Sequence, residues 1–592
     1  MRRMKWLKRK KTEQELPLET PIWLGNRSNG EFYHQSTPLE QKLRAEIIRQ
    51  ADDKARKLGM ERREFLASAM GMATSLSVLN LATACSNSGK KPAFVDMGGI
   101  GGNSVPAAGG SVPAAGGGAG SGMIAGPAGS GAAGLGASGA GAGGAGRGTS
   151  AGGGSGMGAS GMSGGPGTGG AGGYMIPPKT TMDCAMAEDL LSGKEFIMDC
   201  QTHHIELEGM WRQTNAGYGD MLASYFAQYN MCMEPDLKNC IDAQSYLEKI
   251  FLESDTTLAV LSGFPAPLCS DGRTTGCGNP LDNDAMWKSR DRFNALANSQ
   301  RVINHCQVNP TDNLQLQLQI MEKVKTEHNC WGFKSYPEWG PNGVGWMLDD
   351  PKSGIPFIEQ ARKLDSKIIC VHKGIVFPFW DAACSHPKDA GVVAKMYPDT
   401  NFVVYHSAIE IDATGEGPYD PNNTRGTDRL CRVAEMNDLK NKNLYAELGS
   451  VWAQVFTAPE KAQHVIGKLL KYVGEDNVVW GSECIWLGSP QMQIEAFRTF
   501  QISKQFQDMY GYPELTPQIK AKIFGLNAAK IYKINPEDVR CKIRQTKLTA
   551  IKEQMDGELG TRRWAFRGPS GPRTRREFWT LAQLQRNRAP GY

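Results

Sequence analysis

Short apolar runs recur along the chain from residue 196 onward, and stretches with helical periodicity separate them. Eight such runs occur, at 196–200, 257–263, 302–308, 331–335, 367–372, 401–406, 443–448 and 477–482. The segments between them, such as Ile355–Leu364 and Pro459–Val473, place apolar residues every three or four positions. That spacing is typical of amphipathic helices. Strands alternating with helices predict an α/β fold, a (β/α)8 TIM barrel over residues 183–535.

An open, doubly wound parallel sheet is the alternative for the same pattern. No GxGxxG motif follows any of the apolar runs. The dinucleotide-binding version of the open sheet is therefore unsupported.

Polar residues stand where four of the apolar runs end. His203, His372 and His406 follow three of them, and Glu483 follows a fourth. The C-terminal ends of parallel barrel strands meet on one face, where active sites lie. Because imidazole and carboxylate groups bind divalent metals, the pattern predicts a metal site on that face.

Further polar residues belong to the same strand ends. Gln201 lies two positions before His203, so both side chains should face one side of the strand, whereas His204 should point away and be structural. Lys334 could neutralise an anionic substrate, bind metal if carbamylated, or form a salt bridge at the barrel rim. Glu447 ends the seventh run and is the least specific candidate.

Glycine dominates one long segment of the chain. Of the 70 glycines, half lie between residues 98 and 173, where alanine and serine fill most other positions. Such a segment has nothing to bury, so residues 86–182 are predicted to form a disordered tether. The insert 209–244, rich in Tyr, Met and Phe, is predicted to cap the barrel mouth.

A possible export signal precedes this tether. Arg62 and Arg63 stand before Phe65-Leu66, a mildly apolar run follows over 67–84, and Cys85 ends it. The segment 61–85 resembles a twin-arginine signal with a lipobox, although alanine replaces the preferred leucine three positions before the cysteine and the polar leader 1–60 is long. It predicts export, lipidation of Cys85 and a membrane anchor in the periplasm or at the cell surface. The alternative is an amphipathic helix with an incidental arginine pair.

The distribution of charge along the chain indicates which partners the protein can bind. Residues 1–64 carry a net charge of +6 and residues 541–592 carry +8, which leaves the rest of the chain at −9. An acidic body argues against nucleic acid as the main partner, and the basic segment 536–592 is predicted to be a surface tail.

The 14 cysteines contain no CxxC pair. The short-spaced pairs Cys232/Cys240 and Cys269/Cys277 could form disulfides in an exported protein. Cysteines within predicted strands are expected to be inert buried thiols; these are Cys200, Cys370 and Cys484.

Three loop and helix motifs add a family resemblance to the strand ends. They lie at 346–351 (Trp-Met-Leu-Asp-Asp-Pro), at 480–491, and at 523–532, where Asn527-Ala-Ala precedes Ile531-Tyr532. Together with the strand ends, they resemble the amidohydrolase superfamily over roughly residues 195–535. The similar branch is that of metal-dependent TIM-barrel hydrolases, which also contains aminocarboxymuconate-semialdehyde decarboxylase.

The resemblance implies roles for individual residues. His203 and His372 would bind a divalent metal. Gln201 and Glu483 stand where the family has histidine and aspartate. Gln201 would be a weak or water-mediated ligand, and Glu483 would bind the metal or take the proton from water. His406 would assist catalysis, and Lys334 would position an anionic group. The pocket would include three further residues, Trp346, Asp349 and Asp350. Zinc is the first expectation for the metal. Because a neutral amide is a poorer zinc ligand than imidazole, manganese or iron is the alternative.

These features predict an exported metal-dependent hydrolase that attacks a carbonyl group of a small molecule (an amide, ester or lactone) with water. A metal-dependent decarboxylase on the same scaffold is one alternative. A catalytically degenerate ligand-binding surface protein is another, because Gln201 and Glu483 both depart from the family pattern. The expected partners are a small-molecule substrate and a membrane, through the lipid anchor, with no nucleic acid; a homodimer is left open.

Overall fold

The structure is a computed structural model. It describes residues 20–24, 27–28, 33–34, 36–86, 173–209, 211–214, 217, 237–265, 278–376, 380–410, 415–543 and 546–559. Most of the predicted tether, most of the predicted cap and the last 33 residues of the predicted tail (560–592) lie outside the described residues.

Eight parallel strands form one sheet in sequence order, and each overlaps one of the eight predicted runs. The strands are β3 (Met198–Thr202), β4 (Leu258–Leu261), β5 (Val302–Gln307), β6 (Gly332–Ser335), β7 (Ile368–His372), β8 (Asn401–Tyr405), β9 (Leu444–Glu447) and β10 (Val478–Val479). Parallel strands joined by helical crossovers are buried on both faces, which explains their continuous apolar character. The predicted (β/α)8 architecture is confirmed.

Main-chain hydrogen bonds bring the first and last strands together. Cys200 N donates to Trp480 O at 3.0 Å, and Glu483 N donates to Gln201 O at 2.9 Å. His203 N donates to Cys484 O at 2.7 Å. These bonds nearly close the sheet into a barrel and place the end of β3 beside the segment that follows β10.

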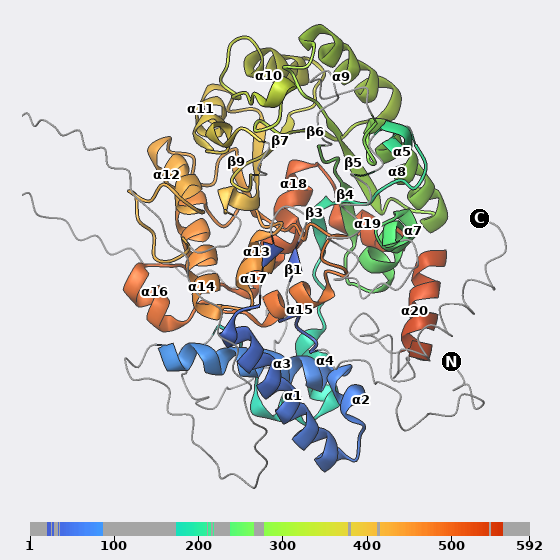
Figure 1. Ribbon diagram of the computed structural model, residues 1–592, viewed down its shortest axis with the longest axis vertical. Coiled ribbons are helices and arrows are strands. Elements are labelled where there is room, and N and C mark those ends of the chain that lie inside the picture. Colours follow the sequence, from blue (N-terminus) through green and yellow to red (C-terminus); the bar gives the residue numbers. More distant parts are fainter. Residues whose placement is uncertain are drawn as a thin grey trace, which may run out of the picture. The chain divides into compact units, whose positions relative to one another are not determined.

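Helices surround the strands in the order expected for this fold (Figure 1). Those before and between the strands are α4 (Cys184–Leu191), α5 (Trp211–Thr214), α7 (Ala243–Leu247), α8 (Asn283–Ala297), α9 (Leu314–His328), α10 (Gly354–Lys363), α11 (Lys388–Met396), α12 (Asp428–Met436), α13 (Val451–Val455) and α14 (Pro459–Lys468). Those after β10 are α15 (Gln491–Thr499), α16 (Lys504–Tyr510), α17 (Pro517–Ala521), α18 (Asn527–Ile531), α19 (Pro536–Ile543) and α20 (Lys547–Leu559).

Short 3-10 turns and π-helical turns complete the list. The 3-10 turns are η1 (Pro178–Thr181), η2 (Leu237–Cys240), η4 (Pro341–Gly343), η5 (Ala382–Cys384) and η6 (His406–Ala408). The π-helical turns are η3 (Glu248–Leu252), η7 (Leu469–Val473) and η8 (Lys522–Leu526).

Alternation along each strand divides the core into two layers. In β7, Ile368 and Cys370 belong to the cluster inside the barrel, whereas Ile369 and Val371 belong to the cluster beneath the helices. The two-residue period of a strand produces this division. It also directs His372, two positions after Cys370, toward the interior at the end of the barrel.

Three N-terminal helices pack against the barrel domain: α1 (Pro38–Leu58), α2 (Arg62–Leu66) and α3 (Ala69–Ser86). A capping box at Thr37 and Glu40 begins α1, and Gly59, in the left-handed conformation, ends it. The α3 side chains Leu76 and Leu79 are fully buried in the same hydrophobic cluster as the outer layer of the barrel. The Asn80 side chain pairs with the main chain of Tyr174, accepting from its N at 3.0 Å and donating to its O at 2.6 Å.

The apolar part of the segment predicted to be an export signal therefore packs into the folded core from Phe65 to Leu79, whereas Glu61 and Arg62 at its start are exposed. A short two-stranded sheet, β1 (Arg27–Ser28) with β2 (Tyr33–His34), precedes these helices. None of the helices among the described residues is both long and apolar enough to cross a membrane.

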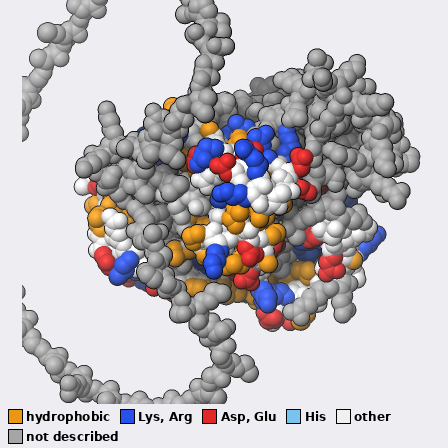
Figure 2. All heavy atoms as spheres, turned by 90° about the horizontal axis from the view of Figure 1, so that it is seen from below, with side chains coloured by type: hydrophobic (Ala, Val, Ile, Leu, Met, Phe, Trp, Pro, Cys, Tyr) orange, Lys and Arg blue, Asp and Glu red, His pale blue; other side chains and the backbone are white. Residues whose placement is uncertain are grey.

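The surface of α1 is polar. Arg49 pairs with Glu46 at 2.6 Å and with Asp53 at 3.1 Å on its exposed side. Figure 2 shows acidic and basic side chains intermixed on the face of the molecule seen from below.

The start of the predicted basic tail differs from the sequence prediction. Residues 536–543 form α19 and residues 547–559 form α20, and Val539 and Leu548 are buried in hydrophobic clusters. Cys240 is disulfide-bonded, and the side chain of the cysteine it bonds lies outside those described. The predicted inert thiols, Cys200, Cys370 and Cys484, are buried and free.

We expect Asn80→Ala to destabilise the whole domain, because it leaves the main-chain N–H and C=O of Tyr174 without partners. The free energy of unfolding should fall by about 1–3 kcal/mol in urea denaturation. Ser77→Ala, a neighbouring change in α3 that removes neither bond, should alter it by less than about 0.5 kcal/mol. Equal stability of the two variants would show that α3 does not dock on the barrel domain in solution.

Candidate active site

A change of register at the end of β3 aims its last side chains at the barrel mouth. The pairing of β3 with β4 shifts between Asp199 and Thr202. Gln201 Nε2 lies 3.5 Å from His203 Nε2, so the two side chains converge as their spacing predicts. Such irregularities often re-aim side chains beside active sites.

His203 and His406 are held in the same way through Nδ1. His203 Nδ1 lies 2.6 Å from Ser262 O, and His406 Nδ1 lies 2.8 Å from Gly449 O. A carbonyl oxygen can only accept, so each Nδ1 carries the proton and each Nε2 keeps its lone pair. Both Nε2 atoms lie 3.5 Å from Gln201 Nε2.

His372 joins this group from β7. Its ring centre lies 4.8 Å from that of His406, and its Nδ1 lies 3.3 Å from Glu338 Oε1. Glu338 and His372 are both fully buried. A carboxylate on one ring nitrogen orients the imidazole and makes the other nitrogen more basic.

Glu483 supplies the carboxylate from the segment after β10. Its backbone is in the left-handed conformation, with φ 57°. Oε1 lies 3.3 Å from Gln201 Nε2 and 3.8 Å from His406 Nε2, while Oε2 accepts a hydrogen bond from Ser450 Oγ. The carboxylate is thus fixed on one oxygen and presents the other to the histidines.

Gln201 occupies the centre of these donors. Its Nε2 faces His203, His406 and Glu483, while its Oε1 is buried with no hydrogen-bond partner among the described residues. Within the part of the chain that the structure describes, no three or more His, Cys, Asp or Glu side chains are placed to hold one metal ion.

Lys334 lies inside the barrel rather than at its rim. Its Nζ is 3.3 Å from the ring centre of Tyr405 and 4.6 Å from that of Tyr336, which itself stacks on His372 at 5.1 Å. Desolvation by burial raises the pKa of Glu447 to about 8, against the opposing effects of the His406 and Gly449 N–H groups and of Lys334. The buried Glu447 carboxyl, with its raised pKa, accepts from His406 N at 3.0 Å, and Lys334 lies near it.

Aromatic side chains surround the histidines. His203 stacks on Trp486 with ring centres 5.5 Å apart and meets Phe264 edge-on at 5.9 Å. Trp380 meets His372 edge-on at 5.0 Å. These contacts fix the imidazole planes and give the site an apolar wall.

The predicted pocket residues lie in the segment before α10, and their role in a pocket stays a prediction. Trp346 is buried in the main core cluster and meets Phe357 of α10 edge-on. Asp350 accepts from Lys352 N at 3.0 Å and from Ser353 Oγ at 2.6 Å, which shapes the turn before α10. Asp349 is half-buried in the same turn. The family resemblance predicted that this loop lines a pocket. Core packing uses Trp346, and the local turn uses Asp350.

His204 faces away from the site, as predicted. It packs between Tyr246 and Phe293 at 5.5 and 6.0 Å, and burial lowers its pKa to about 4. Glu338 and Ser450 are the residues that the sequence analysis missed. Neither ends an apolar run, and each acquires its role only through contact with a distant residue.

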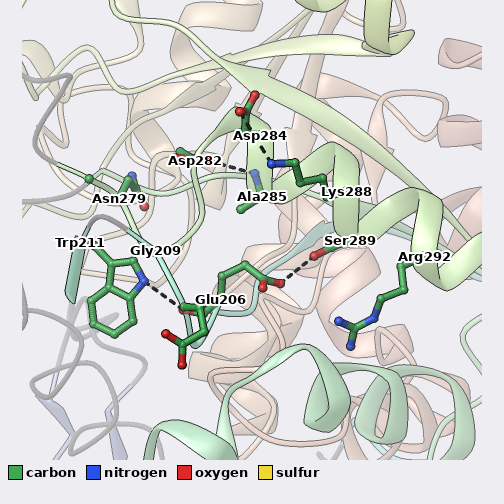
Figure 3. Close-up of a pocket in the computed structure, with 12 residues that line it drawn as sticks. Glu206, Gly209, Trp211, Asn279, Asp282, Asp284, Ala285, Lys288, Ser289 and Arg292 are labelled. Atoms are coloured by element: carbon green, nitrogen blue, oxygen red, sulfur yellow. Dashed lines mark hydrogen bonds and ion pairs between the residues drawn. The ribbon is translucent and has the colours of Figure 1, made fainter. Parts of the chain in front are cut away.

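A separate cavity of about 370 Å³ lies beside the loop that follows β3 (Figure 3). Glu206 borders it, accepting from Ser289 Oγ at 3.0 Å through its side chain and from Trp211 Nε1 at 3.0 Å through its main chain. Acidic and basic side chains are mixed along this cavity, and the convergent histidines do not line it.

Residues 289–534 match the family model described as "Amidohydrolase". The predicted resemblance to the amidohydrolase family is confirmed. Over these residues the barrel is similar to the amidohydrolase family. No curated protein matches the chain.

The chain is also similar to several solved structures. One is 5-carboxyvanillate decarboxylase from Sphingomonas paucimobilis, with 13% identity, a TM-score of 0.37 and coverage of 58% of this chain and 100% of that chain. Another is 2,6-dihydroxybenzoate decarboxylase from Rhizobium, with 13% identity, a TM-score of 0.34 and coverage of 57% and 99%. A third is 4-oxalomesaconate hydratase from Rhodopseudomonas palustris, with 16% identity, a TM-score of 0.32 and coverage of 59% and 98%. The reactions named are those of the other proteins.

His305 anchors a polar network inside the barrel. Its Nε2 lies 2.5 Å from Tyr532 OH, and its Nδ1 lies 2.9 Å from Ser262 Oγ and 3.2 Å from Tyr405 OH. Burial, with a smaller effect of Lys334, lowers the pKa of His305 to about 3. The neutral imidazole is the form that the fold stabilises.

This pKa predicts acid sensitivity. Between pH 6.5 and 3 the unfolded chain binds the His305 proton and the folded chain does not, so stability falls as the pH falls through this window. His305→Gln should reduce the loss of unfolding free energy between pH 7 and pH 4 by about 3 kcal/mol, as measured by urea denaturation. An unchanged pH dependence in the variant would show that His305 is not held neutral.

Proposed function

We propose that this protein is a metal-dependent hydrolase that acts on a carbonyl group of an aromatic small molecule. The observation that carries the proposal is the convergence of His203, His406 and Glu483 on one point, with His372 beside them. The aromatic wall formed by Trp486 and its neighbours favours a flat, apolar substrate.

The donor chemistry fits a divalent metal ion. His203 and His406 keep Nε2 as a lone-pair donor because their Nδ1 atoms donate to main-chain carbonyls. Glu483 adds a negative charge, and the buried Gln201 Oε1 is an oxygen donor without a partner among the described residues. His203, His372, Glu483 and the Gln201 oxygen would hold the ion once the Gln201 nitrogen leaves the centre. Zinc, manganese and iron all suit imidazole and carboxylate donors.

When bound, the ion would polarise the substrate carbonyl and make water a better nucleophile. His406 Nε2 carries a lone pair, so it accepts a proton from water rather than polarising a carbonyl oxygen. Glu483 Oε1, 3.8 Å away, stabilises the resulting imidazolium. Lys334, buried below, adds a positive charge that favours an anionic substrate group.

Decarboxylation on the same scaffold is the second candidate, and the exclusion of water from the site favours it. His203, His372, His406 and Glu483 are each at most 1% exposed. A substrate carboxylate loses hydration there, which destabilises it relative to a transition state in which the charge spreads onto the ring. The electron pair of the broken C–C bond stays on the ring carbon as CO2 leaves, and that carbon then takes up a proton. Product analysis separates the two reactions, because hydrolysis of an amide or ester leaves an acid in solution and decarboxylation releases CO2.

We expect the purified full chain, supplied with Mn²⁺, Zn²⁺ or Fe²⁺, to turn over aryl amides, aryl esters, lactones or carboxylated phenols. His406→Asn should lower kcat/KM by about 10²–10⁴-fold, because the proton acceptor is lost. His328→Asn, a change on α9 where the ring stacks on Trp287, should leave kcat/KM unchanged. A chain that shows no turnover with any of these metals would favour the ligand-binding surface protein instead.

Export through a twin-arginine pathway, with lipidation of Cys85, is also part of the proposal. In a bacterial host, Arg62→Lys combined with Arg63→Lys should keep the chain in the cytoplasm, and Cys85→Ser should abolish incorporation of labelled palmitate. Cleavage before Cys85 would separate most of α3 from the core, so intact mass of the exported form is the decisive measurement. An exported form that retains residues 1–84 and carries no lipid would contradict the lipoprotein prediction.

A further inference from the structure

We propose that the Gln201 amide group takes the place of the metal in the metal-free protein and must turn before an ion can bind. The inference rests on the proposed function for the kind of ion. It concerns metal binding and stability rather than turnover.

The surroundings determine which end of the amide faces the centre. His203 Nε2 and His406 Nε2 are lone-pair acceptors, because both Nδ1 protons are engaged by carbonyl oxygens. Glu483 Oε1 is a third acceptor, at 3.3 Å. An amide oxygen in the centre would face three lone pairs, whereas the NH2 group offers them hydrogen. The nitrogen therefore belongs in the centre.

The NH2 group supplies there what a cation would supply, a positive pole between electron-rich atoms. Its two hydrogens cannot satisfy three acceptors at once. The three distances of 3.3–3.5 Å are accordingly longer than the ~2.9 Å of a strong N–H···O bond. These contacts are weak enough for a metal ion to displace the NH2 group. They are also strong enough to compete with the ion.

The oxygen at the other end of the Gln201 amide, Oε1, also has room in the structure. Gln201 Oε1 lies against the main chain of Gly449, where a Cβ would overlap both this oxygen and Glu447 Oε1. The glycine thus leaves room for the amide in this orientation. Because Oε1 has no hydrogen-bond partner among the residues that the structure describes, turning the amide breaks no bond on that side.

Two consequences follow for metal binding. An incoming ion must displace the NH2 contacts, so the affinity for a divalent ion is lowered. After the turn, Gln201 offers the ion a neutral oxygen rather than an imidazole nitrogen, which weakens zinc binding further. Histidine at this position removes both effects, since its ring nitrogen is itself a metal donor.

The test compares wild-type protein, Gln201→His and Gln201→Ala, each as the full chain freed of metal with EDTA and dialysed. Calorimetric titration with Zn²⁺ and with Mn²⁺ should show Gln201→His binding Zn²⁺ at least about tenfold more tightly than wild type, with a smaller difference for Mn²⁺. Gln518→His, a change at an exposed position of α17, is the control for adding a histidine and should bind like wild type.

Thermal unfolding in EDTA supplies the second readout. Gln201→Ala should have a lower midpoint than wild type, because the acceptors lose their NH2 donor. Equal Zn²⁺ affinity of wild type and Gln201→His, or an unchanged midpoint for Gln201→Ala, would overturn the proposal. If these differences appear while no metal-loaded form turns over any substrate, the proposed enzymatic function fails and the role of Gln201 stands.

Discussion

Main-chain hydrogen bonds between β3 and the segment after β10 hold the candidate active site together. Glu483 N donates to Gln201 O, and His203 N donates to Cys484 O, across almost 300 residues of sequence. Without this closure, Glu483 would have no fixed relation to the β3 residues. Closure also completes the ring of strands, so that His372 and His406, delivered by neighbouring strands, face the same point from the other side.

The second constraint is the set of groups that hold the imidazole rings. Carbonyl oxygens fix His203 and His406 through Nδ1, and Glu338 fixes His372. Each ring therefore keeps Nε2 for chemistry, in a site almost closed to water. The neutral Gln201 amide is the element that departs from this metal-binding logic. Its nitrogen faces three acceptors with two hydrogens, so the same residues can form a loosely hydrogen-bonded group or a metal site.

The N-terminal helices are the third feature, because one of them is buried against the barrel domain. The apolar residues of α3 that resemble a signal segment are buried against the barrel domain, and Asn80 pairs with the main chain of Tyr174. Such packing adds no stability to a protein from which the signal has been cleaved, whereas it stabilises a protein that keeps the helix. The proposed export must therefore work with a segment that also contributes hydrophobic burial to the folded domain.

The sequence by itself determined the barrel and most of the candidate site. Eight apolar runs, each long enough for a buried strand, define the sheet, and polar residues at their ends mark Gln201, His203, His372, His406 and Glu483. These features are local, because strand periodicity and strand ends can be read within a few residues. Only the tertiary structure decided the rest. It assigned Glu338 and Ser450 as partners, moved Trp346 into the core, folded 536–543 and 547–559 into helices and put the Gln201 nitrogen at the centre. Each of these depends on contacts between residues far apart in the chain, whose positions are fixed by barrel closure rather than by any local pattern.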